Sequence, residues 1–150
     1  MSIDNLRINK LRLYLFDIIQ SLNSKYKQIN VNFLSDDVNN YSLDKIPIEN
    51  DEEPWIIGNI LHREVYSFRS RMNYSADSIQ NIENIGFYES FERIIRYNDD
   101  NGILPNIDGI ESIKCLNSGT MNNANTNTAE FDIQIQIEYR ENIDQFIPSM

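Results

Sequence analysis

The small number of histidine and cysteine residues restricts the kinds of catalytic and metal site that this chain can form. His62 is the only histidine and Cys115 the only cysteine. A Ser–His–Asp or Cys–His arrangement would therefore have to include His62, since such nucleophiles need a neighbouring base. Clustered histidine ligands, paired cysteine ligands and an internal disulfide are excluded by count. Cys115 lies in an apolar strand context, which favours a buried structural thiol over a nucleophile.

Carboxylates are plentiful, with 23 Asp and Glu residues. Runs of them at 36–37, 51–53 and 99–100 fall in polar stretches or at a helix end, where a solvated surface is the usual outcome. A pair of carboxylates can hydrolyse a glycoside, but such pairs meet in space and leave no sequence motif. No glycine-rich phosphate loop, HExxH motif, nucleophile elbow or EF-hand pattern occurs. We therefore expect no catalytic residue, no metal site and no cofactor.

Length and charge indicate one domain over residues 1–150. The chain is 41% hydrophobic with a formal net charge of −10. Nucleic-acid-binding proteins normally carry a basic surface, so we expect DNA only as passing cargo. No apolar run is long enough to cross a bilayer, so no membrane partner is expected.

Strict alternation makes residues 128–140 the most regular stretch. Its apolar positions are Phe131, Ile133, Ile135, Ile137 and Tyr139, with polar or charged residues between them. Because strand side chains point alternately to opposite faces, this pattern predicts a strand with one apolar and one polar face. A strand this long spans about 40 Å and needs partner strands and an apolar covering layer.

Two amphipathic helices are predicted to supply that layer. Apolar residues at helical spacing indicate a helix over 3–22, with Asp4 as a plausible N-cap. A second helix is expected from about Ser78 to 101–102, where Gly102 can take the left-handed closing conformation. Gly86 interrupts the second pattern and predicts a break or a close backbone approach.

The remaining strands are predicted at 28–34, at 55–61 and 63–72 (two strands or one bent ribbon), and at 110–119, with a hairpin loop over 120–127. The resulting fold class is α+β, with a mainly antiparallel sheet of four to five strands and two principal helices packed on it.

Two segments are predicted to lie outside this framework. Residues 35–54 lack periodicity and predict a long exposed loop that either orders against a partner or stays a solvated loop. The C-terminal arm 141–150 is apolar for a chain end, so it either docks on a neighbour or frays.

Charges on two predicted strands are complementary. They are Arg63, Arg69 and Arg71 on the strand predicted at 63–72, and Glu130, Asp132 and Glu138 on the long C-terminal strand. We expect them to pair within the sheet or between subunits, and we choose the subunit interface as the hypothesis. A nucleic-acid role for the three arginines is the weaker alternative, given the surrounding acidic residues.

Short segments spread over residues 31–139 carry a family resemblance. They are 40–42 with Pro47, 78–91, Leu104 with Pro105, and Gly119 with 124–129. On these segments the chain resembles the phage minor capsid or tail-completion family of Gram-positive hosts, whose members look like tail terminators. Asparagines stand where that pattern has aspartates before Thr128, and the tail beyond Arg140 is longer than common.

The resemblance implies a virion protein, assembled in the host cytoplasm, that forms a homo-hexameric ring on the head-proximal end of the tail tube. Such a ring stops polymerisation, offers a surface to the neck or connector protein, and contacts the sheath in contractile particles. The residues we expect to dock on tube, sheath or neck are Asp36, Asp37, Tyr41, Asp51, Glu52, Glu53, Asn123, Asn125, Phe146 and Ile147.

Three other functions compete with this one. Another neck or head-completion connector is the alternative within the same class. A small enzyme would need a pocket built around His62 or a carboxylate pair. A ligand-binding protein would work without tail tubes. Substituting His62 by Ala is expected to leave a terminator functional.

Overall fold

The computed structural model describes residues 3–22, 28–54, 58–74, 78–124 and 127–142, without the side chains of Asp4, 78–80 and Asn123. A 3-10 turn, Ile3–Asn5, precedes the regular elements. These are α1 (Arg7–Leu22), β1 (Gln28–Val31), β2 (Asn40–Ile46), β3 (Glu52–Pro54), β4 (Asn59–Asn73), α2 (Ser78–Asp100), β5 (Ile110–Cys115), β6 (Thr120–Ala124) and β7 (Thr128–Asn142).

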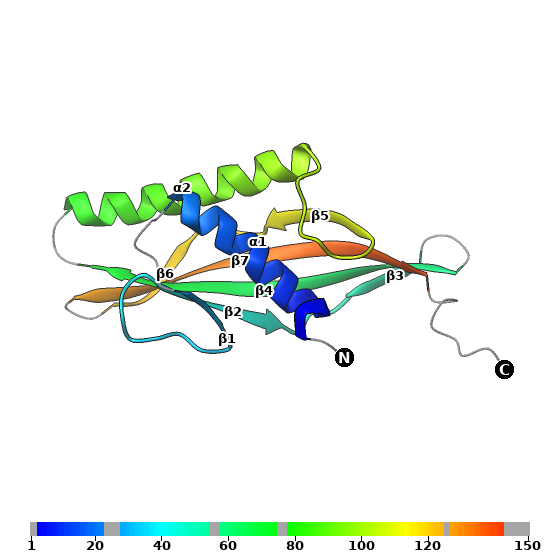
Figure 1. Cartoon of the computed structure of the whole chain (residues 1–150). Coiled ribbons are helices and arrows are strands. Elements are labelled where there is room, and N and C mark those ends of the chain that lie inside the picture. The colour runs from blue at the N-terminus through cyan, green and yellow to red at the C-terminus, as the bar shows by residue number, and fades with distance from the viewer. Residues whose placement is uncertain (1–2, 23–27, 55–57, 75–77, 125–126, 143–150) are drawn as a thin grey trace.

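The strands form one sheet with β4 and β7 at its centre. Its order is β1-β2-β4-β7-β5, with β3 pairing beside β4 and β6 beside β7. All pairs are antiparallel except β1 with β2. Both helices cover one face of the sheet, and no helix of the described residues lies on the other face (Figure 1). The α+β class is confirmed, but the sheet has seven strands rather than four to five.

The alternation in β7 sets which face is apolar. Its residues from Ala129 to Tyr139 are buried at every odd position. Phe68 of β4 lies opposite Ile133 and is fully buried. Its ring stacks on Tyr41 at 5.4 Å and on Phe91 at 5.3 Å, so β2, β4 and α2 share one aromatic core. Contacts of this kind stabilise a pair by about 0.5–1.5 kcal/mol beyond the area that they bury.

The predicted exposed loop over 35–54 is wrong for much of its length. Residues 40–46 form β2 and residues 52–54 form β3. Tyr41 and Leu43 alternate with polar residues and are fully buried under the helices. The clusters of Asn and Asp on either side obscured this short alternation. Asn39 and Asn50 have φ values of 61° and 56°, a left-handed conformation that asparagine tolerates well.

The other predicted strands differ from the structure mainly at their ends: β1 ends at Val31 instead of residue 34, and β5 ends at Cys115 instead of residue 119. Residues 120–124 form β6, which was expected to be part of a hairpin loop. Of the two predicted arrangements, two strands or one ribbon, the described part shows the single strand 59–73, which follows Gly58 with a φ of 80°. Residues 55–57, the start of the expected strand at 55–61, lie outside the described part.

The helices agree with the sequence pattern except near their ends. The first begins at Arg7 instead of residue 3, because residues 3–5 form the 3-10 turn. The second ends at Asp100, and Gly102 closes it with a φ of 71° as expected. Neither described helix is both long enough and apolar enough to cross a membrane.

Gly86 causes no break in α2, which corrects the sequence prediction. The helix runs through it without interruption, and a Cβ built there meets nothing within 4 Å. Substituting Gly86 by Ala should therefore raise the free energy of unfolding by about 0.5–1 kcal/mol, since alanine loses less conformational entropy in a helix. Urea denaturation would measure this, and a lower stability would contradict the open surroundings of Gly86.

Candidate functional site

The helix-free face of the sheet carries the charged residues that the sequence singled out. In the β4–β7 register, Arg71 lies opposite Glu130, Arg69 opposite Asp132, and Arg63 opposite Glu138. The predicted charge complementarity is therefore realised between two strands of the same chain.

Arg63 and Arg69 each join two carboxylates on this face. Arg63 contacts Glu53 at 2.5 Å and Glu138 at 2.9 Å. Arg69 contacts Asp44 at 2.5 Å and Glu130 at 3.3 Å. Partial burial lowers the pKa of Arg69, but its carboxylate partners outweigh that effect and raise it overall.

The other two members of the set also have partners within the chain. The Asp132 carboxylate accepts a hydrogen bond from the Ser67 hydroxyl at 2.5 Å, and Arg71 donates to the Ser35 carbonyl at 2.9 Å. These six charges pair largely within one chain, and their role in a subunit interface stays a prediction. Sequence pattern alone could not distinguish the two kinds of pairing.

The expected docking residues do not form one surface. Asp36 and Asp37 are exposed near the Arg71 end of β4, while the exposed run 51–53 lies beside residues 61–63. These two parts of β4 are about 30 Å apart along the strand. Tyr41 is fully buried, so the prediction of an exposed docking tyrosine is wrong.

The other docking candidates lie wholly or partly outside the described part of the chain. Asn123 lies in β6, although its side chain is not among those described. Asn125, Phe146 and Ile147 lie outside the described residues. Within the predicted arm, residues 141 and 142 belong to β7.

A buried polar cluster lies on the opposite, helix-covered face. Glu64 of β4 is 6% exposed among core side chains. Its carboxylate accepts two hydrogen bonds from Arg7 of α1, at 3.2 and 3.0 Å. It also accepts bonds from Lys45 at 3.0 Å and from the Tyr66 hydroxyl at 2.7 Å. The cluster therefore links α1, β2 and β4 at one point.

The electrostatics of this cluster favour a permanently charged carboxylate. Burial alone would raise the pKa of Glu64, but hydrogen bonds from Arg7, Tyr66 and Lys45 outweigh it and lower the pKa to about 2. The Arg7 guanidinium also lies 4.5 Å from the centre of the Tyr139 ring. Burial, followed by the charge of Glu64, raises the pKa of Tyr139 to about 12.

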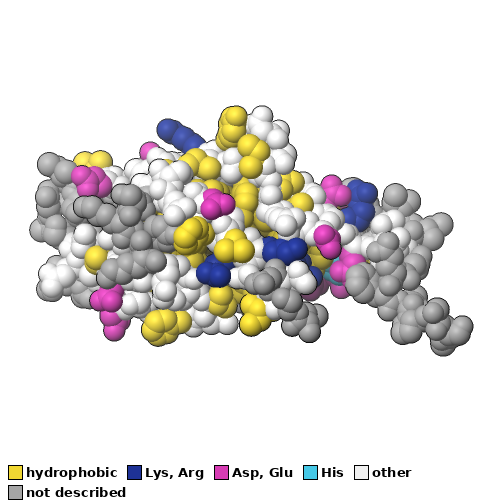
Figure 2. All heavy atoms as spheres, in the orientation of Figure 1, with side chains coloured by type: hydrophobic (Ala, Val, Ile, Leu, Met, Phe, Trp, Pro, Cys, Tyr) yellow, Lys and Arg dark blue, Asp and Glu magenta, His cyan; other side chains and the backbone are white. Residues whose placement is uncertain are grey.

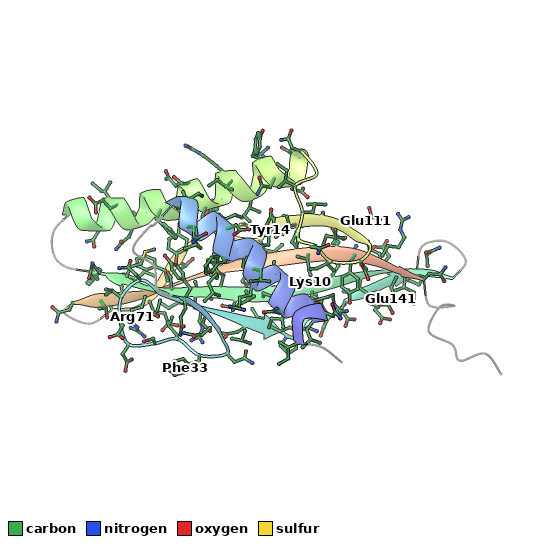
Figure 3. All side chains as sticks on the ribbon, viewed as in Figure 1. Lys10, Tyr14, Phe33, Arg71, Glu111 and Glu141 are labelled. Carbon is green, nitrogen blue, oxygen red and sulfur yellow. The ribbon has the colours of Figure 1, made fainter. Side chains whose placement is uncertain are left out.

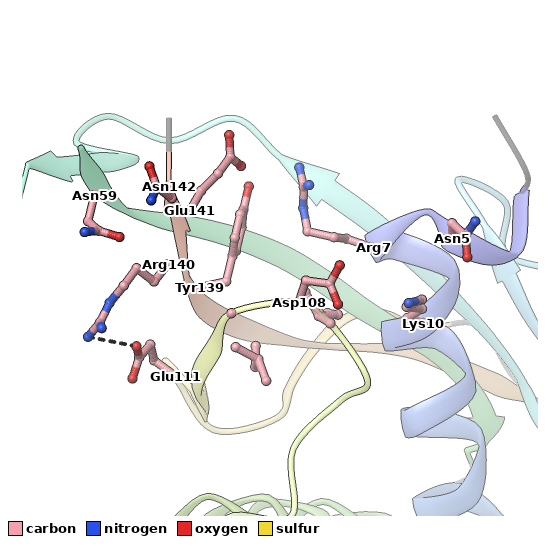
Figure 4. A pocket seen from close by; sticks show the side chains of 13 residues that line it. Asn5, Arg7, Lys10, Asn59, Asp108, Glu111, Tyr139, Arg140, Glu141 and Asn142 are labelled. Carbon is pink, nitrogen blue, oxygen red and sulfur yellow. Dashed lines mark ion pairs between the residues drawn. The ribbon is translucent and has the colours of Figure 1, made fainter. Parts of the chain in front are cut away.

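Clefts surround this cluster where α1 meets the ends of β5 and β7. One, of about 510 Å³, is lined by Arg7, Lys10 and Tyr139 and also by Arg140 and Glu111, which form an ion pair of 3.0 Å (Figure 4). A second, of about 410 Å³, lies on the β2 side and includes Lys45, His62 and Glu64. Figure 2 shows acidic and basic side chains interspersed at this end of the molecule.

This cluster is poorly suited to acid–base catalysis. A general base or acid works best with a pKa near the operating pH. Glu64 titrates far below neutrality, and the pKa values of Tyr66 and Tyr139 are raised by burial. The Glu64 carboxylate also already accepts hydrogen bonds from three side chains of the same chain, Arg7, Lys45 and Tyr66. The cluster is better suited to a structural role, in which it holds α1 against β2 and β4 of the sheet.

No protein-family model matches this chain, and no curated protein matches it. Within the described part of the chain, no three His, Cys, Asp or Glu side chains gather as metal ligands would. Cys115 is half-buried, and burial with the nearby Glu92 charge raises its pKa to about 12.

The Glu64 cluster was not predicted from the sequence, although one feature of the sequence indicated that Glu64 needs partners. Glu64 shares a strand face with Tyr66, Phe68 and Met72, and a charge on an apolar face requires partners. Those partners come from positions 7 and 45, far away in the chain, and no local pattern identifies them.

Proposed function

We propose that this chain is a tail terminator of a phage or phage-tail-like particle. In this proposal it assembles as a homo-hexameric ring on the head-proximal end of the tail tube, stops tube polymerisation, and offers a surface to the neck. Sheath contact would follow in a contractile particle. Its place is the virion, after assembly in the host cytoplasm.

The observation that carries the proposal is the convergence of the segments on which the resemblance rests. Tyr41 of segment 40–42 packs on Phe87 of segment 78–91, with ring centroids 6.2 Å apart. Gly119 lies against Tyr88 so closely that a Cβ at position 119 would overlap the ring. Three segments distant in sequence thus meet in one packing unit, which is the arrangement that the proposal expects of a shared core.

The edges of the sheet suit a ring better than the charged face does. In a closed ring of identical subunits, each copy uses one surface against a different surface of the next. Strand order puts β1 at one edge and β5 with β6 at the other. Val31 and Phe33 are exposed near the first edge, and Leu116 and Met121 are exposed near the second. Phe33 projects from the margin of the molecule in Figure 3.

The overall charge agrees with a channel for DNA. A formal net charge of −10 repels the phosphate backbone, so a genome passing through such a ring would not adhere to it. A headless particle would have no DNA to pass, and the ring would then serve only to end the tube.

Substituting His62 by Ala separates this function from an enzymatic one. At pH 8 the variant is expected to cap tail tubes with the same efficiency as the wild type, since capping depends on surface shape. Tube length after assembly with each protein, measured by electron microscopy, checks this. Loss of function by a variant with an unchanged circular dichroism spectrum would favour a catalytic site at His62.

A further inference from the structure

Phe33 is an exposed aromatic residue on an anchored backbone at the β1 edge of the sheet. It follows β1, and it is 63% exposed (Figure 3). Asn32 has a φ of 56°, and its amide donates to the Leu43 carbonyl of β2 at 3.2 Å. The Phe33 amide donates to the Ser42 hydroxyl at 3.0 Å. Bonds to β2 therefore hold the backbone that presents this side chain to solvent.

A cleft of about 450 Å³ lies at the opposite edge, between α2 and β5. Its apolar lining comes from Ile95 of α2 and from Ile113, Cys115 and Leu116. Ile95 and Ile113 are buried, whereas Leu116 is 44% exposed. Pockets of this size with apolar walls can hold an aromatic group.

Hydrogen bonds between α2 and the chain of β5 hold the walls of this cleft together. The Ile113 amide donates to the Asp99 carboxylate at 3.0 Å, and the Gly119 amide donates to the Glu92 carboxylate at 3.2 Å. The cleft and the backbone of Phe33 are thus both formed before any partner arrives. Preformed surfaces lose less conformational entropy on binding, which favours association.

Phe33 and the cleft lie at nearly the same level of the sheet. Ser42, which holds Phe33, belongs to the row of paired residues that crosses β4 and ends at Asp132 of β7. The Leu116 amide of the cleft donates to the Gln134 carbonyl of β7 at 2.8 Å. These two positions of β7 are about 7 Å apart along the strand. The two surfaces therefore suit side-by-side addition of identical copies, each using one edge against the other edge of the next.

Unpaired charges beside the two surfaces are opposite in sign. Asp36 is exposed three residues after Phe33, and Arg96 and Lys114 are exposed at the cleft. None of these three side chains has a partner within the described part of the chain. The acidic residues of the cleft are Glu92, Asp99 and Asp100. Two of them already accept backbone amides, so the free cations of the cleft can attract Asp36 of another copy.

We propose that Phe33 of one copy inserts into the α2–β5 cleft of the next copy, and that this contact joins the subunits of the hexameric ring. The inference rests on the terminator role for the existence of the ring. Two different surfaces meet in this contact, so repeating it closes a ring when the rotation between copies allows closure. A symmetric contact between Phe33 of two copies is the alternative that the test has to separate.

Photo-crosslinking from position 33 tests the contact directly. Phe33 is replaced by benzoylphenylalanine in the full-length chain, and copies with and without a heavy-isotope label are mixed and assembled on tail tubes. We expect crosslinks between two copies, from position 33 to residues 92–96 or 113–118. Crosslinks from position 33 to any other segment, to the tube protein or within one copy overturn the proposal, as does a ring without crosslinks.

Ile82 is the matched control position for this experiment. It is 64% exposed on α2, so its exposure equals that of Phe33, but it lines neither surface of the proposed contact. Benzoylphenylalanine at position 82 should give no crosslink to the cleft of another copy. The same crosslinks from both positions would mean that exposed aromatic groups react without a specific contact.

Two substitutions measure how much the contact contributes. Phe33→Ala removes the aromatic side chain, and Leu116→Asp places a charge at the cleft. Each should raise the protein concentration for half-maximal capping of tubes by about tenfold or more, because burial of a large apolar side chain is lost. Ile82→Ala should leave that concentration unchanged. Equal capping by Phe33→Ala and the wild type would overturn the proposal even if the crosslinking variant failed to assemble.

Failure of the contact and failure of the terminator role give different results. Capping by the wild type and by Phe33→Ala alike removes the contact and leaves the role. A wild type that neither caps tubes nor forms a ring removes the role. Crosslinking in the concentrated protein without tubes then tests the contact alone: crosslinks from position 33 to the cleft support it, and their absence overturns it.

Discussion

Substituting Glu64 by Gln is expected to lower the free energy of unfolding by about 2–4 kcal/mol. Removing one member of a buried charge cluster typically costs about 3–5 kcal/mol, because the remaining charges lose their partner. We lower that figure because the side chains of Arg7 and Lys45 are 42% and 55% exposed, and water can partly replace the carboxylate. Urea denaturation followed by circular dichroism would measure the change.

Glu111→Gln is the matched control for this substitution. Glu111 also forms an ion pair of 3.0 Å with an arginine, Arg140, but the two side chains are 40% and 37% exposed. Such exposed pairs contribute about 0–1 kcal/mol. Equal losses in the two variants would mean that Glu64 does not fasten α1 to the sheet.

The Glu64 effect should also depend on pH in a defined direction. Its pKa is about 2 in the folded protein, against an ordinary value of 4.5. A lowered pKa adds stability that is fully present above pH 4.5 and is lost as pH falls towards 2. The difference between wild type and Glu64→Gln should therefore be constant from pH 5 to 8 and shrink below about pH 4.5.

Substituting Gly109 by Ala is expected to destabilise the protein by about 2–4 kcal/mol. Gly109 has a φ of 74°, where a Cβ costs about 1 kcal/mol. A Cβ there would also overlap the carbonyl of Arg140, which belongs to the backbone of β7 and cannot rotate away. The Arg140 amide donates to the Gly109 carbonyl at 2.8 Å, so relief of the overlap would disturb the start of β5. Overpacking of this kind adds about 1–3 kcal/mol.

Gly102→Ala separates the two contributions at Gly109. Gly102 has a φ of 71°, but a Cβ there meets nothing within 4 Å. This variant should lose only the conformational part, about 1 kcal/mol. If both variants lost the same stability in thermal or urea denaturation, the close approach of β7 to Gly109 would be contradicted.

Long periodic segments predicted the framework well. The alternation in β7 and the helical stripes of α1 and α2 each extend over many residues, so single exceptions do not hide them. The short strand β2 was missed because only two of its apolar residues, Tyr41 and Leu43, follow the alternation, between clusters of polar residues. β6 was missed because asparagine-rich strands have the composition of a turn. Its pairing with β7, a tertiary contact, decides its conformation.

The charge complementarity of the two strands was predicted from the sequence, and the structure shows it as pairing within the sheet. The arginines of β4 and the acids of β7 are antiparallel neighbours in one chain, because the two strands pair over their full length. The subunit interface itself stays a prediction, for which the proposal favours the two sheet edges over the charged face. The Glu64 cluster could not be predicted from the sequence either, because its members come together only when α1 and β2 pack around β4.

The most direct test of the terminator role is electron microscopy of tails assembled with and without this protein, recording tube length and the density at each end. We expect uniform tubes that end in a ring at the head-proximal end when the protein is present, and tubes of variable length without it. Unchanged lengths with no terminal ring would contradict the role and favour a neck or head-completion connector.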